Sequence, residues 1–258
     1  MISVRNLDKA YSSSLVLSDI SATFPSRRLT SLIGPNGAGK STLLMLIARL
    51  HLPTRGEILI EDKPITDFRL SDYAQKIATL RQSPIFNLRL TVEELVAFGR
   101  FPYSKGALND KDRAQIEQAL EFLSLDRLRK SYIDELSGGQ RQLAFLAMTI
   151  AQETDYLLLD EPLNNLDMKH AVQIMRALRR LCDEQGRTAI MVVHDINFAA
   201  NYSDHIVAMK HGSVRFSGPP SEVITEKNLR DLYDLEFEIL KGEQSMLCNY
   251  FKPSGAIS

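Results

Sequence analysis

The chain has no tryptophan, only two cysteines and almost no net charge, and each shortage narrows its class. With 31 basic and 32 acidic residues the formal net charge is -1, which argues against a strongly basic nucleic-acid binder. Cys182 and Cys248 form no CxxC or Cys/His ligand pattern, so we expect free thiols in a reducing compartment. The 5 histidines are scattered along the chain and predict no metal cage.

Long hydrophobic runs are also missing. No stretch approaches the roughly 18 consecutive apolar residues that a membrane-spanning helix requires. Near the start, Arg5, Asp8 and Lys9 stand where a signal peptide would need its apolar segment. We therefore expect a cytosolic chain, or one bound to a membrane through something else.

The 258 residues are 44% apolar and 24% charged, the composition of a globular protein with one large domain or two small ones. Three apolar runs, at 29–33, 156–159 and 189–193, read as short strands buried on both faces. Apolar residues at helical spacing follow the first run and also occupy the segment between the other two runs. Gly186 is the expected end of the helix in that segment. Strands that alternate with helices predict an α/β fold around a mostly parallel sheet.

The middle of the chain, about 84–152, predicts helices and almost no strand. Thr91 with Glu94, and Ser137 with Gln140, have the spacing of capping boxes. Asn109 begins another helix, and Pro102 is expected to stop the one that ends near Gly99. Further on, runs at 206–209 and 214–216 flank His211-Gly212 and predict a hairpin. We infer a helical subdomain inserted into an α/β core.

The strongest motif fits GxxxxGK[ST] between the first strand and the first helix. Glycines allow successive backbone N–H groups to wrap phosphate oxygens, and the helix N-terminus adds positive potential. Lys40 would reach the β- and γ-phosphates, and Ser41 would ligate magnesium. We call residues 34–42 the phosphate loop: Gly34, Pro35, Asn36, Gly37, Ala38, Gly39, Lys40, Ser41 and Thr42.

Two adjacent acids end the second apolar run. Neighbouring residues of a strand point to opposite sides, so the two carboxylates are expected to do different work. Asp160 would hold the metal ion, and Glu161 would polarise the attacking water.

A further segment carries a family resemblance. Residues 136–140 match the signature sequence of ATP-binding cassette (ABC) ATPases, and beside the phosphate loop this match is highly specific. The signature residues are Leu136, Ser137, Gly138, Gly139 and Gln140. In order along residues 1 to 225, the chain resembles a complete nucleotide-binding subunit of that family.

The resemblance implies further site residues. Tyr11 matches the aromatic residue that stacks on adenine, and Gln82 matches the glutamine near magnesium and the membrane partner. The 164–167 segment, ending at Asp167, resembles the D-loop, and His194 matches the switch histidine that contacts the γ-phosphate. The implied cofactors are ATP and Mg²⁺. Ser137 would face the phosphate loop of a second subunit, so two chains would enclose two ATP molecules head to tail in a homodimer.

The resemblance also implies the architecture. We expect a single ABC domain with a P-loop NTPase core at 1–83 and 153–225 and a helical subdomain at about 84–152. An antiparallel β region is expected at the N-terminus, and an extension at about 226–258.

The stretch 91–103 resembles ATPases that energise uptake of ferric siderophores, haem and vitamin B12. The chain is therefore expected to power a bacterial importer, with a ferric siderophore as the cargo. It would sit on the cytoplasmic face of the inner membrane, beside permease subunits and, indirectly, a substrate-binding protein. Leu95, Val96 and Phe98 would offer an apolar groove to the permease. A haem or vitamin B12 importer, or a regulatory ABC protein without a transport role, are the alternatives.

Overall fold

The three apolar runs of the sequence form buried strands. In the computed structural model, which describes residues 1–12, 14–81, 89–243 and 245–251, they are β3 (Leu29–Ile33), β7 (Tyr156–Asp160) and β8 (Thr188–Val192). Every residue of the three strands is buried, as expected for strands covered on both faces. The expected α/β class is confirmed.

The chain folds into two compact units. The first unit is residues 1–65 with 190–258, and the second unit is residues 66–189. The chain passes from the second unit back into the first within β8. The division into a core at 1–83 and 153–225, a helical subdomain and a C-terminal extension stays a prediction.

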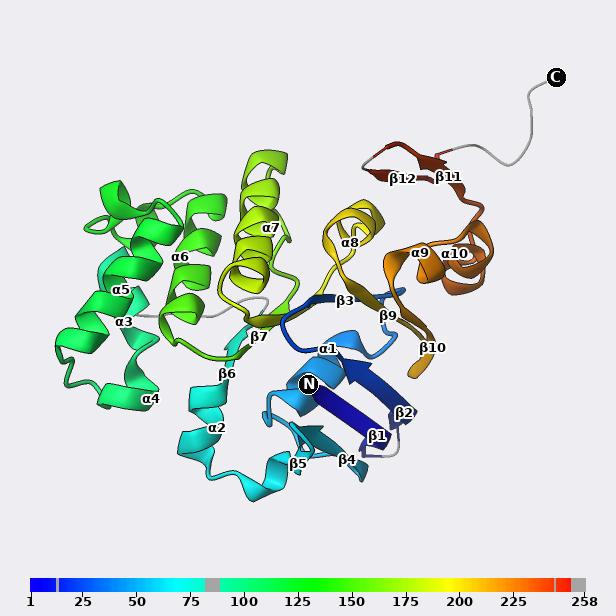
Figure 1. Cartoon of the computed structure of the whole chain (residues 1–258), viewed down its shortest axis with the longest axis horizontal. Coiled ribbons are helices and arrows are strands. Elements are labelled where there is room, and N and C mark those ends of the chain that lie inside the picture. Colours follow the sequence, from blue (N-terminus) through cyan, green and yellow to red (C-terminus); the bar gives the residue numbers. More distant parts are fainter. Residues whose placement is uncertain (13, 82–88, 244, 252–258) are drawn as a thin grey trace. The chain divides into compact units, whose positions relative to one another are not determined.

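The first unit opens with an antiparallel sheet, as expected for the N-terminus (Figure 1). Its strands have the order β2-β1-β4-β5. They are β1 (Ile2–Tyr11), β2 (Ser14–Phe24), β4 (Arg55–Ile60) and β5 (Lys63–Pro64). Residues 2 and 4 of β1 are buried because alternate side chains of a strand face opposite sides. An irregularity in the pairing with β2 between Val4 and Leu7 brings Leu7 to the buried face as well.

A second group of strands in this unit carries the phosphate loop. β3 pairs in parallel with β9 (His205–Lys210), which forms the expected hairpin with β10 (Ser213–Gly218). The helices here are α1 (Lys40–Ile47), α8 (Ile196–Tyr202), α9 (Pro220–Val223) and α10 (Glu226–Tyr233). A terminal hairpin of β11 (Glu238–Lys241) and β12 (Met246–Asn249) packs with β12 against α8 (Figure 1).

The second unit holds the helical stretch. Its elements before the signature are α2 (Leu70–Lys76), β6 (Ile77–Leu80), α3 (Val92–Phe98), α4 (Phe101–Ser104), α5 (Asp110–Phe122), η2 (Asp126–Leu128) and η3 (Ile133–Glu135). α6 (Gly138–Ala151), β7 and α7 (Met168–Asp183) follow, with β6 and β7 parallel. α3, α5 and α6 pack against one another (Figure 1). Among the described residues, no helix has the length and hydropathy of a membrane span.

The capping boxes at Thr91 and Ser137 are confirmed, and Asn109 forms a third with Asp112. Two helix ends differ from expectation. α7 ends at Asp183 with Glu184 as its C-cap, so the left-handed Gly186 lies two residues beyond the cap. Pro102 lies in the first turn of α4 and starts a short helix, because that turn needs no backbone N–H from proline.

Candidate nucleotide site

The phosphate loop depends on glycine where it leaves β3. Gly34 has a φ of 139°, and a Cβ built there would lie 1.9 Å from the carbonyl oxygen of Met209. A side chain at this position would collide with the backbone of β9, which cannot move without breaking the sheet. The close packing of β3 and β9 therefore requires glycine at the start of the loop.

The other end of the loop is the start of α1. Its N-cap residue, Gly39, is left-handed and supplies no side-chain cap bond. The first N–H groups of a helix lack partners within the helix, so an uncapped start attracts anions. Lys40 is 5% exposed, and its Nζ donates to the carbonyl oxygens of Gly34 at 2.7 Å and Pro35 at 2.9 Å. This arrangement is suited to polyphosphate.

A tyrosine from the C-terminal part of the chain holds the beginning of the loop. The backbone N–H of Gly34 donates to the hydroxyl oxygen of Tyr233, at 3.1 Å, from the last turn of α10. Burial raises the pKa of Tyr233, so its phenol group stays protonated and neutral. Nothing in the local sequence indicated this residue, which lies 199 positions from its partner.

Two predicted contact residues belong to the same unit. Val193 N–H donates to the Leu32 carbonyl at 3.2 Å, so the exposed His194 follows a backbone segment paired with the strand that leads into Gly34. Tyr11 ends β1 with 40% of its surface exposed. The His51 ring stands at 90° to it, and Lys9 Nζ lies 4.7 Å from its centroid. Its role in adenine stacking stays a prediction.

The acidic pair ends β7 in the second unit. Asp160 is the last residue of the strand and is 4% exposed. Glu161 has a φ of 52°, a left-handed conformation that turns the chain directly after the strand. The Asn164 side-chain amide donates to the Glu161 carboxylate, and its backbone N–H donates to the Glu161 carbonyl at 3.2 Å. Asn164 thus orients the predicted base, a role that the sequence did not indicate.

The signature residues begin α6. Ser137 Oγ accepts from the Gln140 N–H at 3.3 Å, and Gln140 Oε1 accepts from the Ser137 N–H at 3.1 Å. A hydroxyl that accepts one bond still has its hydrogen to donate. Ser137 and Gly138 are exposed, whereas Gly139 is buried. The turn can therefore offer a hydroxyl and backbone N–H groups to an anion.

The predicted residues fall into two sets. The first unit contains the phosphate loop, Tyr11 and His194, and the second contains Asp160, Glu161, the signature and Asp167. Gln82 lies outside the described residues. Ser41 and Asp160 carry the hydroxyl and carboxylate oxygens that magnesium accepts beside water and phosphate, so the donor set fits Mg²⁺. Within the described part of the chain, no group of three or more His, Cys, Asp or Glu side chains is placed to hold a metal ion.

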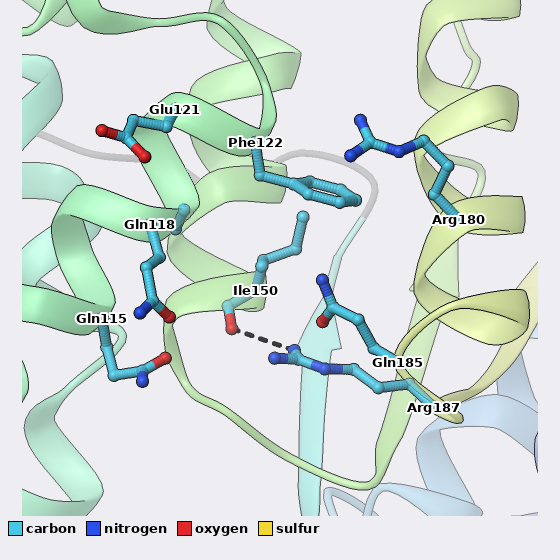
Figure 2. Close-up of a pocket in the computed structure, with 9 residues that line it drawn as sticks. Gln115, Gln118, Glu121, Phe122, Ile150, Arg180, Gln185 and Arg187 are labelled. Carbon is cyan, nitrogen blue, oxygen red and sulfur yellow. Dashed lines mark hydrogen bonds between the residues drawn. The ribbon is translucent and has the colours of Figure 1, made fainter.

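A cavity of about 410 Å³ lies among α5, α6 and α7 (Figure 2). Arg180 lies over the Phe122 ring, with its Cζ 4.4 Å from the centroid, and Arg187 donates to the Ile150 carbonyl at 3.0 Å. None of the predicted nucleotide residues lines the cavity. The Arg187 guanidinium thus satisfies a carbonyl at the C-terminal end of α6, where carbonyl groups lack helical partners.

A smaller apolar groove of about 220 Å³ lies along α3 and α4. We call it the docking groove; it is lined by Glu94, Ala97, Phe98, Phe101, Ser104, Gly106 and Leu108. Phe98 is 45% exposed and Phe101 58% exposed. The expectation for Leu95 and Val96 is wrong, because both are buried against the helical core and do not line the groove.

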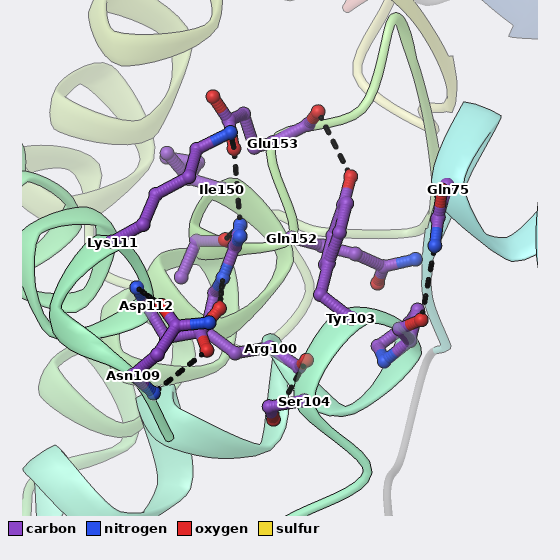
Figure 3. Close-up of polar contacts among 12 residues, drawn as sticks. Gln75, Arg100, Tyr103, Ser104, Asn109, Lys111, Asp112, Ile150, Gln152 and Glu153 are labelled. Carbon is purple, nitrogen blue, oxygen red and sulfur yellow. Dashed lines mark hydrogen bonds and ion pairs between the residues drawn. The ribbon is translucent and has the colours of Figure 1, made fainter. Parts of the chain in front are cut away.

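Arg100, between the two phenylalanines in sequence, is buried and belongs to a polar network (Figure 3). Its guanidinium contacts Asp112 at 2.9 Å and the Ala151 carbonyl at 2.7 Å, and Glu153 lies 3.3 Å away. Arg100 and Asp112 are each 1% exposed. The Tyr103 ring lies over the guanidinium, 4.1 Å from Cζ to centroid. The network joins the backbone of the docking groove to the end of α6.

Comparison with known proteins agrees with this arrangement. The family model described as "ABC transporter" matches residues 17–164. The petrobactin import ATP-binding protein YclP of Bacillus subtilis (strain 168) is 48% identical over 251 residues, covering 97% of this chain and 100% of the relative. The iron(3+)-hydroxamate import ATP-binding protein FhuC of the same strain is 40% identical, covering 93% of this chain and 90% of the relative.

Solved structures show the same fold. A dimeric bacterial ABC transporter cassette superimposes with a TM-score of 0.76 at 30% identity, covering 85% of this chain and 99% of that one. A putative metal-chelate type ABC transporter in an inward-facing conformation gives a TM-score of 0.82 at 26% identity. That match covers 96% of this chain and 95% of the other.

Proposed function

The chain belongs to the ABC transporter family, and we propose that it is the ATP-hydrolysing subunit of an importer whose cargo is a ferric siderophore complex. The proposal that the chain binds ATP is supported by the geometry of the phosphate loop. Its glycine backbone, its uncapped helix start and the buried Lys40 together make a site for the phosphates of ATP.

Each residue of the two sets has a separate task. Lys40 exchanges its bonds to loop carbonyls for bonds to the β- and γ-phosphates, where its positive charge is stabilised better. Glu161, oriented by Asn164, accepts a proton from the attacking water. His194 contacts the γ-phosphate, and Tyr11 stacks on adenine.

Ser41, Asp160 and Gln82 would hold Mg²⁺. When bound, the ion neutralises charge on the phosphate oxygens during transfer. The chain's own contribution is a rigid carboxylate: Asp160 is fixed at the end of a buried strand.

Two copies of the chain form the working unit. A related cassette is dimeric, and a symmetric pair would set the signature residues of each chain against the ATP held by the other. Ser137 then donates its hydroxyl hydrogen to a phosphate oxygen of the partner's ATP.

The docking groove receives a helix of the permease. Phe98 and Phe101 form an apolar surface beside the acidic Glu94, which suits an amphipathic cytoplasmic segment with a basic rim. The chain would thus be peripheral on the cytoplasmic face of a bacterial inner membrane, and a substrate-binding protein would deliver cargo on the other side.

The cargo assignment is supported by the relatives, which import petrobactin and iron(3+)-hydroxamate. We expect a deletion strain to grow poorly under iron chelation and to take up little radio-iron supplied as ferric petrobactin or a ferric hydroxamate. Returning the wild-type gene restores uptake, whereas the Lys40→Ala gene does not.

Other cargoes give other results. Loss of haem or vitamin B12 uptake with normal siderophore uptake would overturn the siderophore assignment and leave the importer intact. Normal uptake of all three would contradict the importer and favour a regulatory ABC protein. Uptake restored by Lys40→Ala would mean that ATP turnover does not drive transport.

A further inference from the structure

His170 stands in the first turn of α7 and is fixed by the residue that caps that helix. Its ring Nδ1 lies 2.8 Å and 2.9 Å from the two carboxylate oxygens of Asp167. Its backbone N–H donates to one of the same oxygens at 2.9 Å. The ring is 20% exposed, so both its position and its orientation are restricted by the surrounding chain.

The same ring fills the space beside the signature. A Cβ built on Gly139 would lie 2.3 Å from His170 Cγ and 2.5 Å from Nδ1. These atoms lie near the stem of the side chain and cannot move aside as a flexible tip could. A Cβ on the preceding Gly138 would meet only the Asn165 carbonyl oxygen, at 4.0 Å. Gly139 must therefore lack a side chain so that the imidazole can lie against the backbone of α6.

One imidazole thus joins two segments that are separate in sequence. Its ring lies on the signature turn at Gly139, and its Nδ1 holds Asp167 at the end of the 164–167 segment. Resting on the proposed function, the signature turn is the surface that the chain presents to the ATP of its partner subunit. A small shift of this turn would misplace the Ser137 hydroxyl and the backbone N–H groups that contact that ATP.

We propose that His170 is a positioning residue, which holds the signature turn and Asp167 in one fixed arrangement for assembly of the ATP-bound dimer. We assign it no contact with nucleotide, because its Nδ1 is engaged by Asp167 and its ring lies against Gly139. Loss of His170 should weaken dimer assembly and leave ATP binding to the monomer unchanged.

Three substitutions separate the two contacts of the ring. His170→Asn keeps an N–H near Asp167 and removes the ring from Gly139. His170→Phe keeps an aromatic ring on Gly139 and removes the bond to Asp167. His170→Ala removes both. Arg176→Ala, an exposed position further along α7, is the matched control.

All four are made in a Glu161→Gln background, which stalls hydrolysis. The measurements are ATP affinity by calorimetry at protein concentrations below dimerisation, and dimer formation with ATP and magnesium by light scattering. We expect His170→Ala to raise the dimer dissociation constant by roughly tenfold or more, which corresponds to a loss of about 1.4 kcal/mol of association free energy. His170→Asn and His170→Phe should fall between it and the control, and ATP affinity should not change.

A purely structural role would give a different pattern. It would lower the melting temperature of the His170 variants while the folded protein dimerised as the parent does, and that result would overturn the inference. As a second check, Gly139→Ala should lower the melting temperature, and adding His170→Ala should restore much of it by vacating the space. No restoration would contradict the contact.

Dimerisation of the Glu161→Gln parent distinguishes failure of the proposed function from failure of the role of His170. If the Glu161→Gln parent does not dimerise with ATP and magnesium, the proposed function fails and takes the role of His170 with it. If the parent dimerises and His170→Ala dimerises equally well, only the role of His170 is wrong.

Discussion

The phosphate loop and the Arg100 network each bury a cation, yet they hold it in opposite ways. Lys40 donates to neutral carbonyl oxygens of its own loop, beside a helix start without a capping side chain. Arg100 is matched by the carboxylate of Asp112, equally buried, and by a helix-end carbonyl. A cation matched by a carboxylate is part of the framework, whereas a cation among carbonyls and open N–H groups is arranged for an incoming anion.

The largest expected effect is on turnover at the phosphate loop. Lys40→Ala should abolish ATP hydrolysis and weaken ATP binding, because the lysine charge is directed at phosphate. The core does not need this charge, so the free energy of unfolding should fall by only about 1 kcal/mol, the scale of a typical hydrogen bond. Calorimetry with ATP and denaturant unfolding check both. Unchanged affinity and turnover in a folded variant would mean that Lys40 is not arranged for phosphate.

The next effect concerns the base. Glu161→Gln should slow hydrolysis by about 10²–10⁴-fold, the scale expected for loss of a general base, while ATP binding remains. The glutamine can keep the contact with Asn164 but cannot accept the proton. Single-turnover hydrolysis measures the chemical step. A variant with normal turnover would remove Glu161 from the mechanism and direct attention to His194.

On the framework side, Arg100→Met should cost about 3–5 kcal/mol of unfolding free energy, because it leaves the Asp112 charge buried without its partner. ATP affinity should be unchanged. The double variant Arg100→Met with Asp112→Leu should recover part of the loss, and the double-mutant cycle gives the coupling energy. A loss below about 1 kcal/mol would mean that the pair behaves like an exposed one.

The buried Asp112 carboxylate should also make stability depend on pH. Burial opposes ionisation of Asp112, but bonds from the Asn109 N–H and the Arg100 guanidinium outweigh it and hold its pKa below the ordinary value. A depressed pKa stabilises the fold above the unfolded value of about 3.9 and loses that effect as pH falls through the folded value. The stability difference between wild type and Arg100→Met should therefore shrink in acid.

The smallest expected effect is at the anchor of the phosphate loop. Tyr233→Phe removes the acceptor for the Gly34 N–H and should cost about 1 kcal/mol of unfolding free energy. We expect a modest loss of ATP affinity, because the loop keeps its other constraints. Tyr202→Phe, at the end of α8, is the matched control. Equal ATP affinity in both variants would show that Tyr233 serves stability alone.

Local sequence patterns predicted the elements that local chemistry determines. The strand that enters the phosphate loop was predictable because its apolar run ends in glycine and proline, and the helix start at Ser137 because its cap lies within four residues. The contacts that organise the site escaped prediction. Tyr233 with Gly34, and His170 with Gly139, are tertiary pairings that no periodicity encodes.

The residues of α3 that line the docking groove were also not predictable from the sequence. Helical spacing placed Leu95, Val96 and Phe98 together, but one helix face packs on the core and only Phe98 reaches the groove. Which side of an amphipathic helix is covered depends on the neighbouring helices, and these cannot be read from the helix itself.

In the proposed dimer, each active site is shared between two copies of the chain. The most direct test mixes Lys40→Ala protein, which lacks a working phosphate loop, with Ser137→Arg protein, which lacks a working signature. One intact composite site should form in each mixed dimer, so ATPase activity should rise above that of either variant alone. Activity that stays at the level of the separate variants, with mixed dimers shown to form, would contradict the claim.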